Sequence, residues 1–89
     1  MIHARPGRIA AAQQRLFAEE LGERIRVARM REGLTQNELA RRAGIASGTM
    51  CLFEAGDRQP NAWTLARVAE VLDCSVEELV PITTAKEGV

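Results

Sequence analysis

The sequence of 89 residues contains no tyrosine, one tryptophan and two phenylalanines, so aromatic residues make up only 3% of it. Runs of β-branched residues are also scarce, whereas Leu, Ala, Arg and Glu dominate. Strands are enriched in aromatic and β-branched residues, while the four dominant residue types are good helix formers. The composition therefore predicts an all-α protein, and the length predicts a single domain.

Other shortages exclude whole classes of function. No stretch approaches the roughly eighteen apolar residues that span a bilayer, and no apolar segment follows the basic start as in a secretory signal. With one histidine, no Cys/His/carboxylate cluster and no glycine-rich phosphate loop, the chain offers no metal, cofactor or catalytic site. Cys51 and Cys74 are far apart and are expected to be reduced thiols. We expect a cytoplasmic protein that is not an enzyme and has no cofactor.

The net charge is zero, but the two halves of the chain differ in sign. Residues 1–43 hold nine arginines against five acidic residues, and residues 44–89 hold three basic residues against seven acidic ones. A neutral chain with this asymmetry can still present one basic face to a polyanion.

The first half of the chain predicts a helix that begins after Pro6 and Gly7. Residues 8–20 are good helix formers, and an apolar stripe continues from Phe17 through Leu21, Ile25 and Ala28. Gly22 weakens the junction without forbidding one long helix, and Gly33 predicts its end.

Two short helices separated by a tight turn are predicted next. Thr35 and Glu38 form a capping box before residues 36–43, and Gly44 ends that helix. Only about three residues then precede a helix over 47–55. This arrangement is typical of a helix-turn-helix.

Two further helices follow the turn after Gly56. Asn61 is an N-cap for residues 62–72, and Ser75 with Glu78 forms a second capping box before a short helix that Pro81 stops. The inward stripe of the longer helix comprises Leu65, Val68, Ala69 and Leu72.

Four pieces agree in order and spacing with a known family: LGERIRVARMREGLTQNELARRAGI, Glu54-x-Gly56, RQPN and TLARVAEVLDCSVEELV. They resemble the phage-repressor and Cro type of helix-turn-helix, the xenobiotic-response-element family. The resemblance implies a compact five-helix, lambda-repressor-like DNA-binding domain over 21–80. Residues 1–20 are then an N-terminal arm or helical extension, and residues 81–89 a C-terminal tail.

The resemblance also implies roles for matching residues. Arg29 and Glu54 match a pair that joins the first and third helices and orients the recognition helix. Gln36 matches a residue that holds a DNA phosphate where free N–H groups favour an anion, although it could equally be a solvated first-turn residue. The expected phosphate contacts are Gln36, Asn37, Arg41, Arg42, Arg58 and Asn61, with Arg5, Arg8 and Arg15 as further sources of positive charge.

The helix over 47–55 has no lysine or arginine, and its only charge is Glu54. Met50 and Phe53 are expected to face inward. Hydroxyl groups can hydrogen-bond to base edges and apolar side chains can cover a thymine methyl group, so base reading does not require charge. The expected base contacts are Ser47, Gly48, Thr49, Cys51 and Leu52.

This helix departs from the common family pattern. Relatives often carry arginine or lysine where this chain has Ser47, Leu52, Ala55 and Asp57. The loss of arginine-to-guanine contacts implies a different base preference or weaker binding. A protein-binding surface is the alternative interpretation.

The outer parts of the chain leave alternatives open. Residues 1–20 could be a basic arm that wraps DNA, a helix that covers the core or forms a dimer through Ile9, Ala12, Leu16 and Phe17, or a segment without a role. An apolar end patch is expected to form the dimer interface from Trp63, Val76, Leu79, Val80 and Ile82.

The predicted function is a sequence-specific transcriptional regulator, most simply a repressor that occupies a promoter. A homodimer would bind a pseudo-palindromic operator of double-stranded DNA, because one small domain reads only a few base pairs. No small-molecule effector and no membrane partner are implied. The alternative is a protein-binding helix-turn-helix that antagonises another regulator by forming a heterodimer with it.

Overall fold

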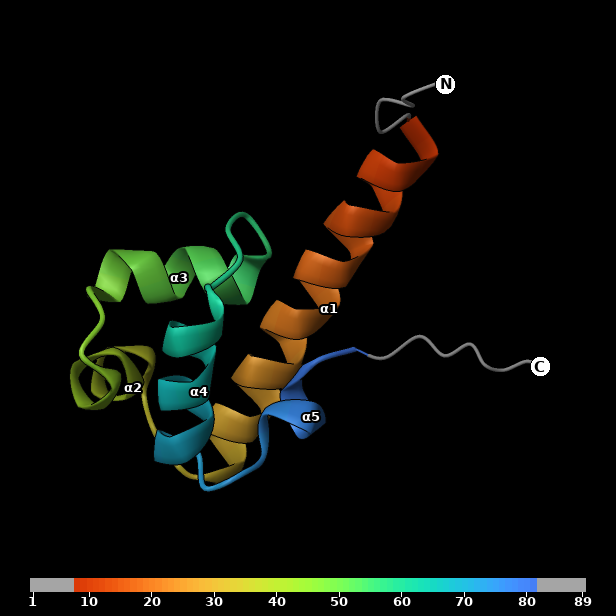
Figure 1. Ribbon diagram of the computed structural model, residues 1–89. Coiled ribbons are helices and arrows are strands. Elements are labelled where there is room, and N and C mark those ends of the chain that lie inside the picture. The colour runs from red at the N-terminus through yellow and green to blue at the C-terminus, as the bar shows by residue number, and fades with distance from the viewer. Residues whose placement is uncertain (1–7, 82–89) are drawn as a thin grey trace.

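A computed structural model of the chain describes residues 8–81, and Figure 1 shows how their helices are arranged. No strand occurs among these residues, which confirms the predicted all-α class. None of the helices in this part of the chain is long and apolar enough to cross a membrane. The helices are α1 (Arg8–Arg31), α2 (Gln36–Ala43), α3 (Ser47–Ala55), α4 (Ala62–Val71) and α5 (Val76–Leu79).

The helix boundaries follow the capping residues. The Thr35 hydroxyl accepts a hydrogen bond from the Glu38 N–H at 3.0 Å, and the Glu38 carboxylate accepts one from the Thr35 N–H at 2.8 Å. Hydrogen bonding of the Glu38 carboxylate to Thr35, first to its backbone N–H and then to its side chain, lowers the pKa of Glu38. Ser75 and Glu78 form the second box, and Asn61 caps α4. The capping assignments made from sequence are confirmed.

α1 is one continuous helix of 24 residues that passes through Gly22. At 1.5 Å per residue, residues 8–20 extend it by about 20 Å. Figure 1 shows this first half leaning away from the other helices. The predicted extension is thus part of α1. Residues 1–7, with most of the expected basic arm, and residues 82–89, with most of the expected tail, lie outside the described residues.

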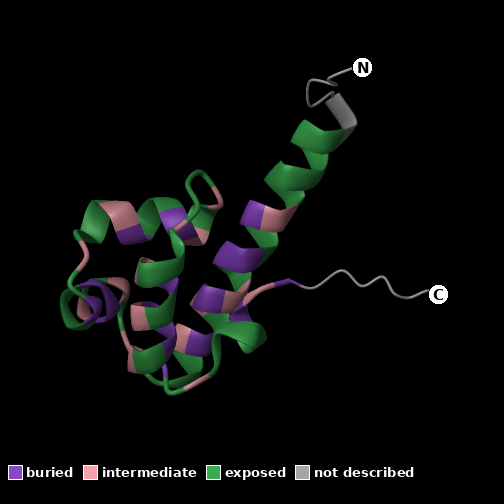
Figure 2. Cartoon of the chain, in the orientation of Figure 1, coloured by how far each residue is buried: buried purple, intermediate pink, exposed green. Residues whose placement is uncertain are grey.

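The core lies where the second half of α1 meets the other four helices. Figure 2 shows buried residues on their facing sides, while the first half of α1 is mostly exposed. The predicted inward stripe of α4 and the residue after it is buried, which confirms that prediction. The largest fully buried side chains are Ile25, Leu39, Met50, Val68, Leu72 and Leu79.

Two glycines allow α1 and α3 to approach closely. A Cβ atom on Gly22 would lie 2.3 Å from the Phe53 carbonyl oxygen and 2.7 Å from that of Glu54. A Cβ atom on Gly56, whose φ is +81°, would lie 2.7 Å from the Glu19 Cα. Gly22 therefore sets the distance between the two helices, a role that its position inside a helix did not reveal.

Candidate nucleic-acid interface

The turn between α2 and α3 is fixed by backbone and side-chain bonds. Gly44 adopts the left-handed conformation with φ 75°, and the Ile45 N–H donates to the Ala40 carbonyl at 2.8 Å. From α4, the Arg67 Nε donates to the Ala43 carbonyl at 3.2 Å. This contact satisfies a carbonyl at the C-terminus of α2 and ties the turn to α4.

α3 has one buried face and one face open to solvent. Met50 and Phe53 are buried, as predicted, and the outward face is formed by the exposed residues of the helix. Leu52 is 40% exposed, although it is a large apolar residue. The expected base-contact residues are all on this outward face: Ser47, Gly48, Cys51 and Leu52 are exposed and Thr49 is half-buried.

Glu54, the only charge on α3, points away from the open face. Its side chain is 4% exposed and makes a bidentate ion pair with Arg29 of α1, with Nε to Oε2 at 2.7 Å and Nη2 to Oε1 at 3.0 Å. Arg29 Nη1 also donates to the Leu34 carbonyl at 2.9 Å. A bidentate arginine neutralises a carboxylate that would be costly to bury alone. The structure thus contains the pair expected from the family resemblance.

Gln36 is the third member of this network. Its Nε2 donates to Glu54 Oε1 at 3.1 Å, so the first turn of α2 is joined to α3. The side chain is therefore neither simply solvated nor free to rotate. Gln36 is half-buried at the N-terminus of α2 and so keeps part of its surface open to solvent.

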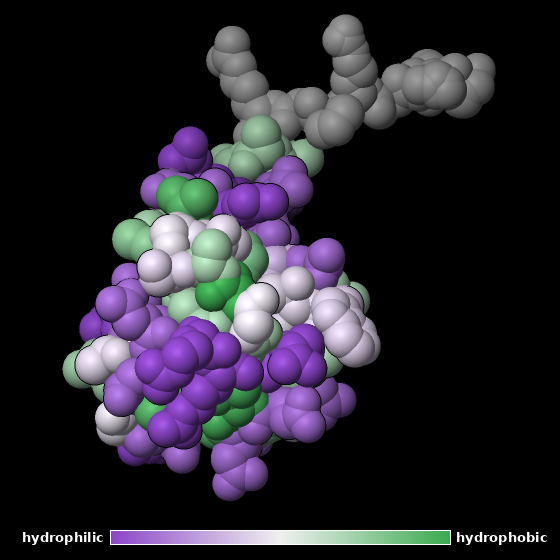
Figure 3. Space-filling model, turned by 90° about the vertical axis from the view of Figure 1, so that its left-hand side faces the viewer, coloured by the Kyte–Doolittle hydropathy of each residue, from purple (hydrophilic) through white to green (hydrophobic). Residues whose placement is uncertain are grey.

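Basic and polar residues flank the outward face of α3. Arg41 and Arg42 are exposed on α2, and Figure 3 shows strongly hydrophilic side chains gathered over α2 beneath a paler patch over α3. The other expected phosphate contacts are also exposed: Asn37 at the start of α2, Arg58 in the loop after α3, and Asn61 at the N-cap of α4.

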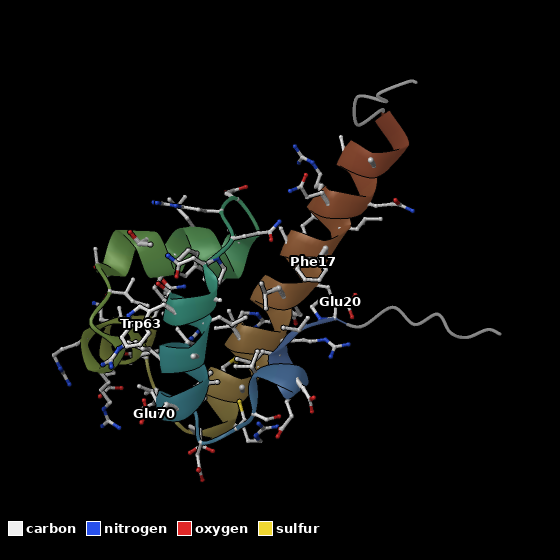
Figure 4. The ribbon with its side chains drawn as sticks, viewed as in Figure 1. Phe17, Glu20, Trp63 and Glu70 are labelled. Atoms are coloured by element: carbon white, nitrogen blue, oxygen red, sulfur yellow. The ribbon has the colours of Figure 1, made fainter. Side chains whose placement is uncertain are left out.

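The residues assigned to a dimer interface do not form one patch. Trp63 is 71% exposed and lies on the α2 side of α4, whereas α5 packs against α1 and α4 (Figure 4). Leu79 is only 1% exposed, because it fills the core between these helices. Its assignment to the interface is therefore wrong. Val76 is exposed, Val80 is half-buried, and Ile82 lies outside the described residues.

The titratable side chains of the described region do not group as a metal site would. Among residues 8–81, no three His, Cys, Asp or Glu side chains group as metal ligands would. Cys51 is exposed on the open face of α3 and Cys74 is half-buried, both as free thiols. Burial raises the pKa of Cys74.

Comparison with known proteins identifies the family of this chain. The family profile of a helix-turn-helix domain matches residues 20–81. The chain is also 39% identical over 64 residues to YazB, an uncharacterized HTH-type transcriptional regulator of Bacillus subtilis, covering 72% of this chain and 93% of that protein. The chain belongs to the helix-turn-helix transcriptional regulators of the Cro and lambda-repressor type.

Solved structures agree with the family assignment of this helix-turn-helix regulator. The restriction-modification controller protein C.AhdI from Aeromonas hydrophila matches with a TM-score of 0.68 and 29% identity, over 70% of this chain and 94% of that one. The structure of the complex between the SinR and SinI proteins matches with a TM-score of 0.64 and 35% identity, over 66% of this chain and 58% of that one. The regulator is therefore a DNA-binding protein with the lambda-repressor-like fold.

Proposed function

We propose that this regulator is a cytoplasmic repressor that binds a pseudo-palindromic operator as a homodimer and acts by occupying a promoter. The observation that carries the proposal is the uncharged, outward face of α3 beside the exposed arginines of α2. The proposed activity is binding, without turnover of a substrate and without a small-molecule effector.

The proposal divides DNA recognition between two groups of residues. Phosphate contacts position a protein on the duplex and base contacts specify the sequence. Arg41 and Arg42 lie in the last turn of α2, and Arg58 lies beyond the C-terminus of α3, so they can contact phosphates on both sides of the recognition helix. The residues proposed to contact phosphates are Gln36, Asn37, Arg41, Arg42, Arg58 and Asn61.

Base recognition is proposed for the open face of α3. The hydroxyls of Ser47 and Thr49 can donate to or accept from base edges, and Leu52 and Cys51 can cover thymine methyl groups. Nothing lies within 4 Å of the position that a Cβ atom of Gly48 would occupy, so the backbone there can approach the duplex closely. The buried Arg29–Glu54 pair supports this role, since it removes the one carboxylate from the face that meets the DNA.

Pairing of two copies follows from the small size of the reading surface. Two α3 helices related by a twofold axis would lie about 34 Å apart to enter successive major grooves. The exposed Trp63, the exposed Val76 and the half-buried Val80 are the proposed contributors to pairing. They lie on different sides of α4, so we do not expect all three in one contact.

The second candidate function is heterodimerisation with another regulator. It is favoured by the exposed apolar residues Leu52 and Trp63 and by the absence of basic residues from α3. The similarity to a protein that was crystallised in a SinR–SinI complex is compatible with it.

Selection of bound fragments from random and genomic DNA distinguishes the two functions. The repressor predicts a recovered palindrome whose half-sites are separated by about one helical turn, and binding that weakens steeply with salt. Recovery of unrelated fragments at every salt concentration, together with tight binding of a second helix-turn-helix protein through α3, would replace it with the alternative. Arg42→Ala should reduce affinity for all fragments, whereas Arg24→Ala, which removes a residue paired with Glu20, is the matched control.

A further inference from the structure

An open cavity lies between the first half of α1 and the loop that joins α3 to α4. Its volume is about 620 Å³. α1 contributes Gln14 and Arg15, and the loop contributes Asp57, Arg58 and Gln59. Two guanidinium groups and one carboxylate thus line the same space, which leaves one positive charge in excess.

The position of this cavity relates it to α3. Gly56, the C-cap of α3, is part of its wall, so the cavity begins where the recognition helix ends. Figure 1 shows the first half of α1 rising past that end of α3 and past the loop. The first half of α1 and the C-terminal end of α3 therefore form a corner, with the cavity at their junction.

Gly56 and Glu19 are in close contact at this corner. Because a Cβ atom on Gly56 would lie 2.7 Å from the Glu19 Cα, the loop and α1 are in direct contact immediately below the cavity. Arg15 lies one helical turn above Glu19, on a helix that is continuous with the packed second half of α1. The side chain is thus carried by a helix whose direction the core fixes.

We infer that this cavity binds a phosphate of the DNA backbone, held between Arg15 of α1 and Arg58 of the loop. The inference rests on the proposed DNA-binding function and adds α1 to the DNA contact surface. A duplex on the outward face of α3 would place one strand against the side of α1 that carries Arg15. Arginine suits a phosphate because its planar group donates two parallel hydrogen bonds, and Gln14 and Gln59 add neutral donors.

A neighbouring hollow along α1 differs in chemistry. It shares Gln14 and Gln59 with the cavity. Its other lining residues include Leu16, Phe17 and Glu20, which bring a carboxylate in place of an arginine. Figure 4 shows Phe17 and Glu20 on this part of α1, toward the chain that follows α5. The basic side of the projecting helix is thus the side next to α3.

The experiment compares Arg15→Ala with Arg24→Ala on a duplex selected by the wild-type protein. Both changes remove one positive charge from α1, but Arg24 pairs with Glu20 at 2.9 Å and does not line the cavity. We expect Arg15→Ala to raise Kd by about threefold to tenfold at low salt and to reduce the salt slope by about 1, as for one lost phosphate contact. Arg24→Ala should leave both quantities near the wild-type values.

A scan of the duplex with single methylphosphonate substitutions locates the contact. One neutralised phosphate should weaken binding of Arg15→Ala and of Arg58→Ala less than it weakens binding of the wild type, because each variant keeps only one of the two arginines that hold that phosphate. If wild-type protein binds the duplex and Arg15→Ala behaves as Arg24→Ala does, the inference is wrong while the proposed function stands. If the wild type binds no duplex selectively, both fail. Thermal unfolding of each variant checks that the exposed substitutions leave the fold intact.

Discussion

Replacement of Gly22 by alanine tests whether the α1–α3 contact is as close as the structure indicates. The added methyl would lie 2.3 Å from the Phe53 carbonyl oxygen, well inside van der Waals contact, and the atoms that it meets belong to the backbone. Because a backbone cannot rotate away as a flexible side chain does, the two helices must separate. Insertion of one extra carbon into a packed contact costs about 1–3 kcal/mol.

Gly48→Ala is the matched control for this change. Both glycines are in α-helices, but no atom lies within 4 Å of a Cβ atom at position 48. Alanine is favoured over glycine in a helix by up to about 1 kcal/mol, a gain that both variants share. Gly48→Ala should therefore be as stable as the wild type or slightly more stable.

Gly22→Ala should lower the melting temperature, whereas Gly48→Ala should leave it unchanged or raise it slightly. For a domain of this size, about 1 kcal/mol corresponds to about 4–8 °C, so Gly22→Ala should melt several degrees below the wild type. Circular dichroism during urea and thermal unfolding measures both variants. Equal stability of Gly22→Ala and Gly48→Ala would refute the close approach. A separation of the helices would also stretch the Arg29–Glu54 pair, so Gly22→Ala should bind DNA more weakly.

Three further predictions concern the ion pair, the thiols and the first capping box. Arg29→Ala should lower the free energy of unfolding by about 3 kcal/mol, because it leaves Glu54 buried without its partner. If the losses of Arg29→Ala and Glu54→Ala are additive in a double-mutant cycle, the two side chains do not interact. Cys51 should react with a thiol reagent faster than Cys74, because Cys74 is half-buried and has a raised pKa. Bound DNA should slow the reaction of Cys51 only. If DNA slows the reaction of both thiols equally, the orientation assigned to α3 is wrong. Because the pKa of Glu38 is lowered in the folded protein, its carboxylate stabilises the fold fully at pH values above the ordinary pKa of 4.5. That stabilisation is lost as the pH falls through the lower pKa of the folded state. The difference in stability between wild type and Glu38→Gln should thus shrink in acid, and a difference independent of pH would count against the box.

The helices were predictable because their signals are local. A capping box such as Thr35 with Glu38 requires only residues three apart, and a left-handed glycine such as Gly44 ends a helix wherever it occurs. The inward face of α3 was predictable from the three-residue spacing of Met50 and Phe53.

Features that depend on contacts between distant residues were less accessible. The importance of Gly22 arises from carbonyl groups more than thirty residues later in the chain. The hydrogen bond from Gln36 to Glu54 likewise joins two different helices, so it depends on how α2 and α3 pack and has no local signal in the sequence. Leu79 was assigned to a dimer interface as part of an apolar end patch, but the packing of α5 against α1 and α4 buries it.

The most direct test of whether the uncharged outward face of α3 reads the bases is a binding measurement with Leu52→Ala and Arg42→Ala. It compares the affinity of each variant for the selected operator with its affinity for a scrambled duplex. The measured quantity, for each variant, is the Kd for the scrambled duplex divided by the Kd for the operator. We predict that Leu52→Ala lowers this ratio, whereas Arg42→Ala weakens binding to both duplexes equally and leaves the ratio unchanged. An unchanged ratio for Leu52→Ala together with a reduced ratio for Arg42→Ala would contradict the account.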